Sequence, residues 1–297
     1  AGAYFYRNVG SLSNFFPTVY AVDMLGWGLS SRPPFHEVND RGSIESAEEF
    51  FVESLEAWRS ANKIDKMVLS GHSFGGYIAV AYAERYPERI DRLILLSPIG
   101  VPEPPPPDDS DRGDMSLKFK VFLGVFRIMF EVTTPGGFLR SLTEYRGSTM
   151  VKSYVEKRLP EIRDLDEQEA LADFLYLNAV LPPSGECFLR SLFTSSIFAK
   201  KPLVFRIPSL QVESVHFMYG TQDWMDVTGG MHTETLAHKL AQEVVGSSLF
   251  TPDVNVCLVP NAGHLLTIEN PCIVNAGMIR ICGGRVRVPD RSMPTIM

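Results

Sequence analysis

The chain has 297 residues, 45% of them hydrophobic and 21% charged, which is the mixture of a globular protein with a real core. This length suits one large α/β domain with an insertion, or two small domains. The net charge of −7 argues against a nucleic-acid partner, and no apolar run reaches the ~18 residues of a membrane-spanning helix. The four cysteines form no C-x-x-C pair, which favours reduced thiols in a cytosol-like compartment; a disulfide among the three near the C-terminal end stays open.

The first hundred residues alternate between strand and helix patterns. Short apolar, β-branched runs predict strands at residues 19–23, 67–70 and 93–96. Near-helical spacing of apolar residues predicts helices over 44–61 and 77–84. Strands that alternate with helices indicate a mostly parallel sheet with right-handed crossovers.

This regularity ends at a proline-rich stretch, residues 102–107, which an acidic stretch follows at 108–114. From there to about Lys200 the pattern is mainly helical, so we interpret the region as a helical cap inserted into the sheet order. Residues 117–132 are strongly apolar with interspersed cations. They suit either a cap helix that faces lipid or one that packs on the catalytic core, and the apolar face alone does not separate the two.

Sheet patterns resume after the cap. We predict strands at 215–220 and 254–259, with a helix over about 234–244 between them. The predicted domains are therefore a first core segment, the cap and a second core segment, at residues 1–100, 101–200 and 201–297.

The strongest local signal is Gly71-His72-Ser73-Phe74-Gly75, which matches G-x-S-x-G between a predicted strand and a predicted helix. In that context the serine occupies a sharp turn that exposes its hydroxyl, and we expect the flanking glycines to be needed because larger side chains would collide. Ser73 is the predicted nucleophile. The alternative is an ordinary glycine-rich strand-to-helix turn.

A serine nucleophile needs a base and a residue that orients the base, in the chain order Ser, Asp or Glu, His. Only His264 follows the last predicted strand in a glycine-containing loop, so we predict it as the base. The other five histidines fit less well: His36 precedes the serine, His72 lies inside the turn, His216 suits a packed core position, and His232 and His238 suit a helix surface.

Two aspartates compete for the third position. Asp223 lies three residues past the end of a predicted strand, where it would point toward the base, so we favour it. Asp226 is the rival, and its alternative role is a helix cap or a solvated loop charge.

Stabilising the oxyanion requires two backbone N–H donors. We expect one from Phe74, directly after the nucleophile. The other should come from a loop after an earlier strand, which would lie before Ala1. Residues 1–3 would then be the remaining part of that loop. We therefore expect this sequence to lack a complete oxyanion hole.

Several longer stretches resemble one branch of the α/β-hydrolases. This branch includes the coactivator of adipose triglyceride lipase, a lysophospholipase that acts on N-acyl phosphatidylethanolamines, a yeast mitochondrial cardiolipin deacylase and lysophosphatidic acid acyltransferase-like relatives. The likeness covers about residues 1–271. The similar stretches are residues 23–33 (DMLGWGLSSRP), 51–59 (FVESLEAWR), 65–69 (DKMVL) with the serine turn, 184–186 (SGE), 201–203 (KPL) and 219–226 (YGTQDWMD).

The resemblance implies an α/β-hydrolase fold, a lipid acyl ester as substrate, and the Asp223 and His264 positions as acid and base. Two departures from the branch carry information. The lipase coactivator has asparagine at the nucleophile position, whereas this chain has Ser73. Many relatives also have His-x-x-x-x-Asp at the late histidine, read as an acyltransferase signature, whereas Glu269 stands here in place of the aspartate.

Three functions follow as hypotheses. The first is a serine hydrolase of lysophospholipid, phospholipid or glyceride esters, acting through Ser73, His264 and Asp223. The second is an acyl-CoA-dependent lysophosphatidic acid acyltransferase, and the third is a non-catalytic lipid-surface protein that activates a separate lipase. The sequence predicts no cofactor and no metal. We expect a cytoplasmic protein in peripheral contact with a lipid-droplet or organelle membrane, mitochondria included.

Overall fold

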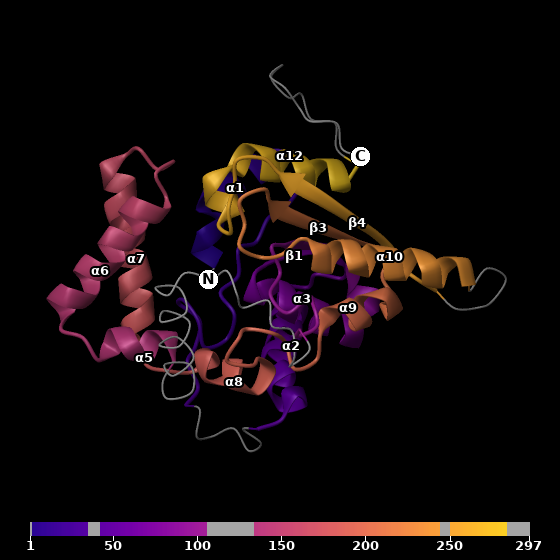
Figure 1. Cartoon of the computed structure of the whole chain (residues 1–297), viewed down its shortest axis with the longest axis horizontal. Helices are drawn as coiled ribbons and strands as arrows, with labels where there is room; N and C mark the ends of the chain where they lie inside the picture. The colour runs from indigo at the N-terminus through magenta and orange to yellow at the C-terminus, as the bar shows by residue number, and fades with distance from the viewer. Residues whose placement is uncertain (1, 35–41, 106–133, 244–249, 284–297) are drawn as a thin grey trace. The chain divides into compact units, whose positions relative to one another are not determined.

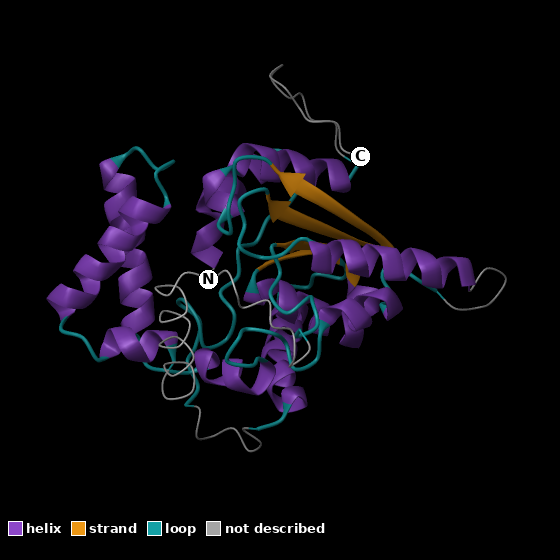
Figure 2. Cartoon of the chain, in the orientation of Figure 1, coloured by secondary structure: helices purple, strands orange, loops and turns teal. Residues whose placement is uncertain are grey.

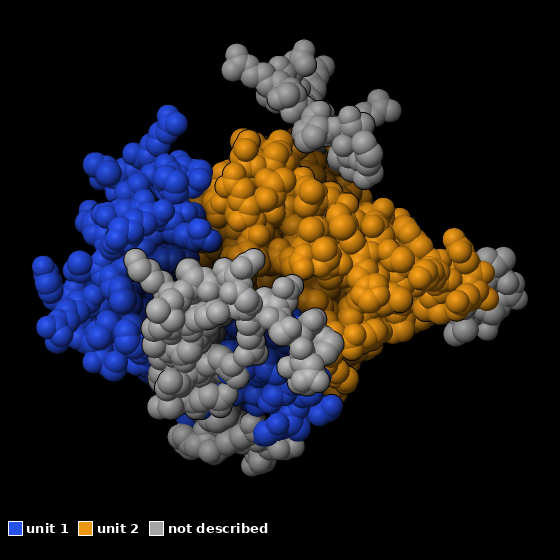
Figure 3. Space-filling view, viewed as in Figure 1, with its two compact units in different colours: residues 1, 23–50, 104–200 blue, residues 2–22, 51–103, 201–297 orange. Residues whose placement is uncertain are grey.

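The computed structural model describes residues 2–34, 42–105, 134–243 and 250–283 (Figure 1). Two compact units divide the chain, and Figure 3 colours them separately. The sheet unit comprises residues 2–22, 51–103 and 201–297, and the helical unit comprises residues 23–50 and 104–200. The domain boundaries predicted from the sequence stay a prediction, and the apolar stretch 117–132 lies outside the described residues.

The sheet unit is built on four parallel strands in the order β1-β2-β3-β4, drawn in orange in Figure 2. The strands are β1 (Met67–His72), β2 (Ile90–Leu96), β3 (Ser214–Gly220) and β4 (Asp253–Val259). Because all four strands run in one direction, their carboxyl ends meet at one edge, where α/β folds place their ligands. The α/β fold class and these four predicted strands are confirmed.

Helices and short 3-10 turns connect and cover the strands. In the sheet unit they are η1 (Gly2–Phe5), α1 (Tyr6–Leu12), α3 (Phe74–Arg85), η3 (Pro87–Arg89), α9 (Leu203–Arg206), η5 (Ile207–Ser209), α10 (Thr228–Glu243), α11 (Leu266–Glu269) and α12 (Pro271–Ile281), and α2 (Ile44–Ala61) runs from one unit into the other. The prediction for α2 is confirmed. Helix α10 begins at Thr228, six residues before the predicted start at about residue 234.

The core follows from the alternation of side chains along each strand. Ile94, Leu96 and Met218 pack on one face of the sheet, in a buried cluster that includes residues of α1 and α12. Phe217 and Tyr219 stack two residues apart, with ring centroids 5.9 Å apart. A Cβ at Gly230 would lie 2.8 Å from the Tyr219 ring, so the glycine in α10 permits this close approach.

One strand prediction is wrong. Residues 19–23 have strand-like composition, yet they belong to none of the four described strands. A strand requires a hydrogen-bonded neighbour, and the described ladders join only β1, β2, β3 and β4. The segment nevertheless runs close to the N-terminal turn, because a Cβ at Gly2 would lie 2.6 Å from the carbonyl oxygen of Ala21.

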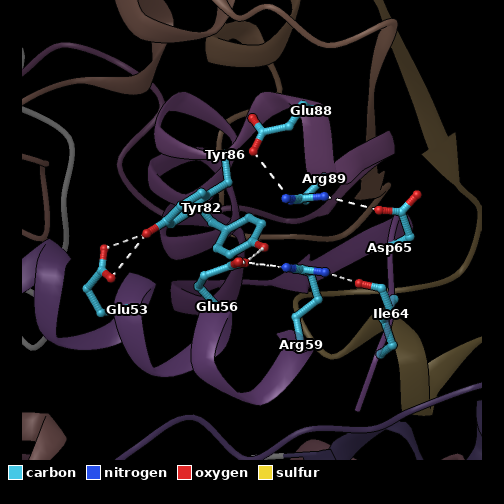
Figure 4. A network of polar contacts seen from close by, with 9 residues as sticks. All are labelled: Glu53, Glu56, Arg59, Ile64, Asp65, Tyr82, Tyr86, Glu88 and Arg89. Carbon is cyan, nitrogen blue, oxygen red and sulfur yellow. Dashed lines mark hydrogen bonds and ion pairs between the residues drawn. The ribbon is translucent and has the colours of Figure 1, made fainter. Parts of the chain in front are cut away.

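A polar network joins α2 to α3 in the sheet unit (Figure 4). The Glu56 carboxylate accepts hydrogen bonds from the Arg59 guanidinium at 2.7 and 2.8 Å and from the Tyr82 hydroxyl at 2.6 Å. Arg59 also donates to the carbonyl oxygen of Ile64, at the end of the turn after α2. Hydrogen bonding to Arg59 lowers the pKa of Glu56 to about 2, so the carboxylate is ionised at neutral pH.

In the helical unit, α5 (Pro135–Arg140), α6 (Glu144–Arg158) and α7 (Leu165–Val180) precede the short η4 (Gly185–Phe188) and α8 (Leu189–Leu192). Thr143 and Asp164 cap α6 and α7 through their side chains. The Glu186 carboxylate accepts hydrogen bonds from Thr134 at 2.7 Å and from Arg140. The helical character expected for the cap is confirmed in its described part.

The loop after residue 22 belongs to the helical unit, which explains why two distant stretches of the family resemblance occur together. Gly26 has a φ of +79°, and a Cβ there would lie 2.2 Å from the Gly185 nitrogen. The Ser184 hydroxyl donates to the Pro33 carbonyl oxygen at 2.7 Å. Residues 23–34 and 184–186 therefore form one packed structure.

Candidate active site

Ser73 occupies a strained turn between β1 and α3. Its φ of 53° and ψ of −116° lie in a region that L-residues rarely adopt, and such strain is common at functional positions. Two backbone hydrogen bonds hold the turn against β2 and its loop: Ser73 N–H donates to Leu96 O at 2.9 Å, and Ile99 N–H donates to Ser73 O at 3.2 Å. The backbone therefore fixes the position from which the hydroxyl projects.

The glycines of the turn have unequal roles. A Cβ at Gly71 would lie 2.3 Å from the Gly75 carbonyl oxygen, so this glycine is required. The prediction for Gly75 is wrong, since a Cβ there would meet nothing within 4 Å. The second required glycine is Gly76, where a Cβ would lie 2.8 Å from the Pro98 side chain. Gly76 therefore has no room for a side chain, because it packs against Pro98 in the loop after β2.

The structure brings Ser73, His264 and Asp223 together. The Ser73 Oγ lies 3.1 Å from His264 Nε2, and His264 Nδ1 lies 3.2 Å from Asp223 Oδ1. All three belong to the sheet unit and follow the carboxyl ends of β1, β4 and β3, respectively. This chain of contacts has the geometry of a nucleophile, a base and an orienting acid.

Asp223 is held as a buried carboxylate. Its side chain has 0% exposure, and Oδ1 also accepts a 2.9 Å hydrogen bond from the Met225 amide. Burial alone would raise the pKa of Asp223, but the hydrogen bonds from His264 and Met225 outweigh it, so the pKa lies below its ordinary value. The rival Asp226 instead accepts a 2.9 Å hydrogen bond from the amide of Thr228, the first residue of α10.

The loops that carry Asp223 and His264 are joined through their backbones. Gln222 N–H donates to Ala262 O at 2.9 Å, and Thr221 N–H donates to Val259 O at 3.0 Å. A Cβ at Gly220 would lie 2.2 Å from the Ala262 carbonyl oxygen, so the two loops meet only because residue 220 is glycine. The acid and the base are therefore positioned together.

Two side chains that sequence reasoning left unassigned border His264. His72 Nε2 donates to the His264 carbonyl oxygen at 2.7 Å. Burial, and to a smaller extent repulsion from a charged His264, lowers the pKa of His72 to about 4. The Trp224 ring lies against the imidazole, with centroids 5.0 Å apart, and is 56% exposed. The available signals were the histidine directly before the nucleophile and the tryptophan directly after the acid.

The predicted oxyanion donor Phe74 is the first residue of α3, so its amide lies at the positive end of the helix. Ala1 lies outside the described residues, and Gly2 begins η1. The second donor stays a prediction. Of the remaining histidines, His216 lies in β3 beside the Ser214 hydroxyl, His232 and His238 are exposed on α10, and His36 lies outside the described residues.

All four cysteines are free thiols, so the open alternative of a C-terminal disulfide is not realised. Cys257 is partly buried against the core, and this burial raises the pKa of its thiol to about 11, so the thiol is protonated and unreactive at neutral pH. None of the helices within the described ranges combines the length and hydrophobicity that crossing a bilayer requires.

A parallel sheet with a strained serine turn and a Ser-His-Asp arrangement in chain order defines the α/β-hydrolase class. Comparison with protein families agrees: the alpha/beta hydrolase fold family matches residues 3–271, and the chain belongs to that family. The resemblance found in the sequence is confirmed.

Named relatives place the chain more finely within the family. It is 31% identical over 287 residues to a "Probable 1-acylglycerol-3-phosphate O-acyltransferase" of Oryza sativa subsp. japonica, over 94% of this chain and 64% of that protein. It is 30% identical over 277 residues to the "1-acylglycerol-3-phosphate O-acyltransferase ABHD5" of Homo sapiens, over 93% of this chain and 72% of that protein. The chain thus spans less than two thirds of the rice relative.

Solved structures support the fold. Carboxylesterase CesB (YbfK) from Bacillus subtilis has a TM-score of 0.59 and 22% identity, over 96% of this chain and 81% of that chain. A thermophilic esterase from Thermogutta terrifontis has a TM-score of 0.56 and 20% identity, over 95% and 85% of the two chains. At this identity the likeness describes the fold alone.

Proposed function

We propose that this chain is a serine hydrolase of lipid carboxylic esters. The observation that carries the proposal is the continuous contact from Ser73 Oγ through the His264 imidazole to Asp223, at 3.1 and 3.2 Å. A serine hydroxyl is a poor nucleophile at neutral pH unless a positioned base removes its proton, and this arrangement supplies the base.

The geometry supports a two-step reaction. Ser73 Oγ attacks the ester carbonyl while His264 Nε2 takes the hydroxyl proton, and His264 then gives that proton to the departing alcohol. Asp223 orients the imidazole and stabilises its charged form. Water, activated by the same imidazole, releases the fatty acid from the acyl-Ser73 ester and restores the free hydroxyl.

Electrostatic stabilisation falls to the backbone. The tetrahedral intermediate carries a negative charge on the former carbonyl oxygen, and we expect the Phe74 amide, which belongs to the first residue of α3, to donate to it. Each such donor is typically worth ~10²–10³ in turnover, so the reaction depends on this helix end as well as on the three side chains.

The relatives' names support a lipid acyl ester as substrate, since they describe acyl transfer to an acylglycerol phosphate. Lysophospholipids, phospholipids and glycerides share the ester that Ser73 would attack. Such substrates reside in membranes or droplets, so the proposal includes peripheral contact with a lipid surface. Flotation of the purified chain with phosphatidylcholine vesicles tests that contact, and a chain that stays at the bottom of the gradient contradicts it.

A second candidate is acyl-CoA-dependent acylation of lysophosphatidic acid, favoured by relatives named 1-acylglycerol-3-phosphate O-acyltransferase that share 29% to 32% of their residues with this chain. Both reactions can share the acyl-Ser73 intermediate and differ in the acceptor, which is water in one and a lysophosphatidic acid hydroxyl in the other. The contacts of the three side chains are the same for both.

Treatment with a fluorophosphonate probe tests the shared intermediate. We expect wild-type protein to be labelled at Ser73 and the Ser73→Ala variant to remain unlabelled. Separate, unlabelled wild-type protein is then given a lysophospholipid alone, or acyl-CoA with lysophosphatidic acid. Free fatty acid supports the hydrolase and phosphatidic acid supports the transferase. A folded wild-type protein without labelling contradicts both and leaves the lipase-activating surface protein as the better hypothesis.

A further inference from the structure

Glu269 lies five residues after His264, at the end of α11, and the proposed reaction has no role for it. Its two carboxylate oxygens accept hydrogen bonds from the residues on either side of the histidine. Gly263 N–H donates to Oε2 at 2.5 Å, and Leu265 N–H donates to Oε1 at 3.0 Å. One side chain therefore binds the backbone immediately before and immediately after His264.

This double contact restricts the part of the chain that aims the imidazole. Residues 260–265 form a turn between β4 and α11, without regular secondary structure to fix their dihedral angles. Hydrogen bonds from amides to a carboxylate are charge-assisted and about twice as strong as neutral ones. With both neighbouring amides bound, the Cα–Cβ bond of His264 keeps one direction.

The helix that carries the Glu269 carboxylate is itself held in place by hydrogen bonds. It closes the short helix α11, in which the Ile268 and Glu269 amides both donate to Leu265 O, at 2.8 and 2.9 Å. The N-terminal segment holds the same helix, since Arg7 donates to Ile268 O at 3.0 Å and Thr267 donates to Tyr4 O at 3.2 Å. The His264 carbonyl oxygen is bound separately by His72.

We propose that Glu269 is a positioning residue: its carboxylate fixes the backbone on both sides of His264 and so directs the imidazole at Ser73. The proposal rests on the proposed serine chemistry. It also gives the His-x-x-x-x-Glu spacing a physical meaning, because five residues allow one turn of helix to return an acidic side chain to the amides that flank the histidine. On this account the acid supports the base and has no contact with an acceptor alcohol.

The Glu269→Gln variant tests the role kinetically. Glutamine presents an NH₂ group to one of the two amides, so one contact becomes repulsive. We expect kcat for a p-nitrophenyl acyl ester to fall by about 10²-fold with KM nearly unchanged, because displacing a catalytic group by about 1 Å costs that much. Glu269→Asp keeps both acceptor oxygens on a shorter side chain and should recover kcat to within about tenfold of wild type.

Glu243→Gln is the matched control, since Glu243 is exposed at the end of α10 in the same unit and should leave kcat unchanged. Circular dichroism verifies that each variant is folded. A folded Glu269→Gln protein with wild-type kcat overturns the proposal. A raised KM at unchanged kcat also overturns it, since that result describes a substrate contact.

A measurement on wild-type protein covers the case in which Glu269→Gln does not fold. Because the Glu269 carboxylate accepts from both amides, the Gly263 and Leu265 N–H groups should exchange their hydrogens with solvent slowly. Amides that exchange as fast as those of an open loop overturn the proposal. Failure of the serine chemistry is recognised separately, as wild-type protein that no fluorophosphonate labels, and the amide test keeps its meaning in that case.

Discussion

Glu56 and Asp223, two carboxylates of the sheet unit, both accept hydrogen bonds, but from partners of different charge. Glu56 has both oxygens occupied, by Arg59 and by the Tyr82 hydroxyl, at 2.6 to 2.8 Å. Asp223 is bound at Oδ1, by His264 and the Met225 amide, and among the described residues it has no cationic arginine or lysine partner like the one that Glu56 has in Arg59. Arg59 is a permanent cation, whereas His264 gains its charge only by taking a proton.

The difference shows where the electrostatic stabilisation is used. The pairing of Glu56 with Arg59 is complete in the resting protein, so it stabilises the fold. In the proposed reaction Asp223 faces an imidazole that takes up a proton in the transition state, so the strongest interaction of Asp223 would appear during that reaction. The Glu56 network should therefore be measurable as stability, and the Asp223 contact as rate.

Replacing each carboxylate by its amide is the strongest test of this comparison. Asp223→Asn should lower kcat by roughly 10³–10⁴-fold, because the amide neither stabilises the imidazolium nor selects the tautomer that leaves Nε2 free to accept a proton. Glu56→Gln is the matched control and should leave kcat within about twofold of wild type. Similar rates for Asp223→Asn and wild type would contradict the role of Asp223.

Lowering the pH tests the surroundings of the candidate active site through His72, the histidine that binds the His264 carbonyl oxygen. The folded pKa of His72, about 4, lies below its ordinary value of 6.5 because of burial, so the unfolded chain binds the proton more readily. The stability from neutral His72 is fully present above pH 6.5 and is lost as the pH falls through about 4, a decrease of roughly 3 kcal/mol. Urea unfolding between pH 7 and pH 4 measures it.

The matched variants for this titration are His72→Gln and His238→Gln. The first should flatten the pH dependence of the unfolding free energy, leaving the smaller slope from His216, whose pKa burial also lowers. The second replaces an exposed histidine of α10 and should retain the full slope. Equal slopes in the two variants would show that the acid response does not come from His72.

Sequence reasoning succeeded where local pattern and motif agreed. The buried strand β1, the serine turn and α3 follow one another within twenty residues, 67–85, so their context could be read directly. His264 and Asp223 are predictable because each follows a predicted strand in the chain order of the triad. Parallel strands bring such loops to one edge, which is why distant residues could be placed together.

The errors concern contacts between segments far apart in the chain. Strand composition at residues 19–23 says nothing about whether a neighbouring strand is paired there. Gly75 and Gly76 look equivalent in sequence, and only their spatial neighbours distinguish them, since a Cβ at Gly76 would meet Pro98 and the Gly71 carbonyl oxygen. The Glu269 contacts depend on how α11 returns to the histidine loop. None of these distances is encoded in local propensity.

Glu56→Gln should reduce the free energy of unfolding by about 2 kcal/mol at pH 7, since it leaves Arg59 without its counter-charge. Solvent reaches part of the carboxylate, so the loss is smaller than its pKa alone implies. The folded pKa of about 2 is below the ordinary 4.5, so the contribution is complete above pH 4.5 and is lost as the pH falls through about 2. An unchanged urea midpoint at pH 7 would contradict this.

The smallest expected effects come from two tyrosines of the same network (Figure 4). Tyr82 is fully buried and donates to Glu56 at 2.6 Å, so Tyr82→Phe should cost about 1.5 kcal/mol. Tyr86 donates to Glu53 at 3.0 Å, and the Glu53 side chain is 42% exposed, so Tyr86→Phe should cost about 0.5 kcal/mol or less. Urea midpoints of the two variants measure the difference. Equal losses of unfolding free energy would mean that burial does not determine how much these hydrogen bonds stabilise the fold. The view that the buried Glu56 network acts mainly on stability would then lose its physical basis.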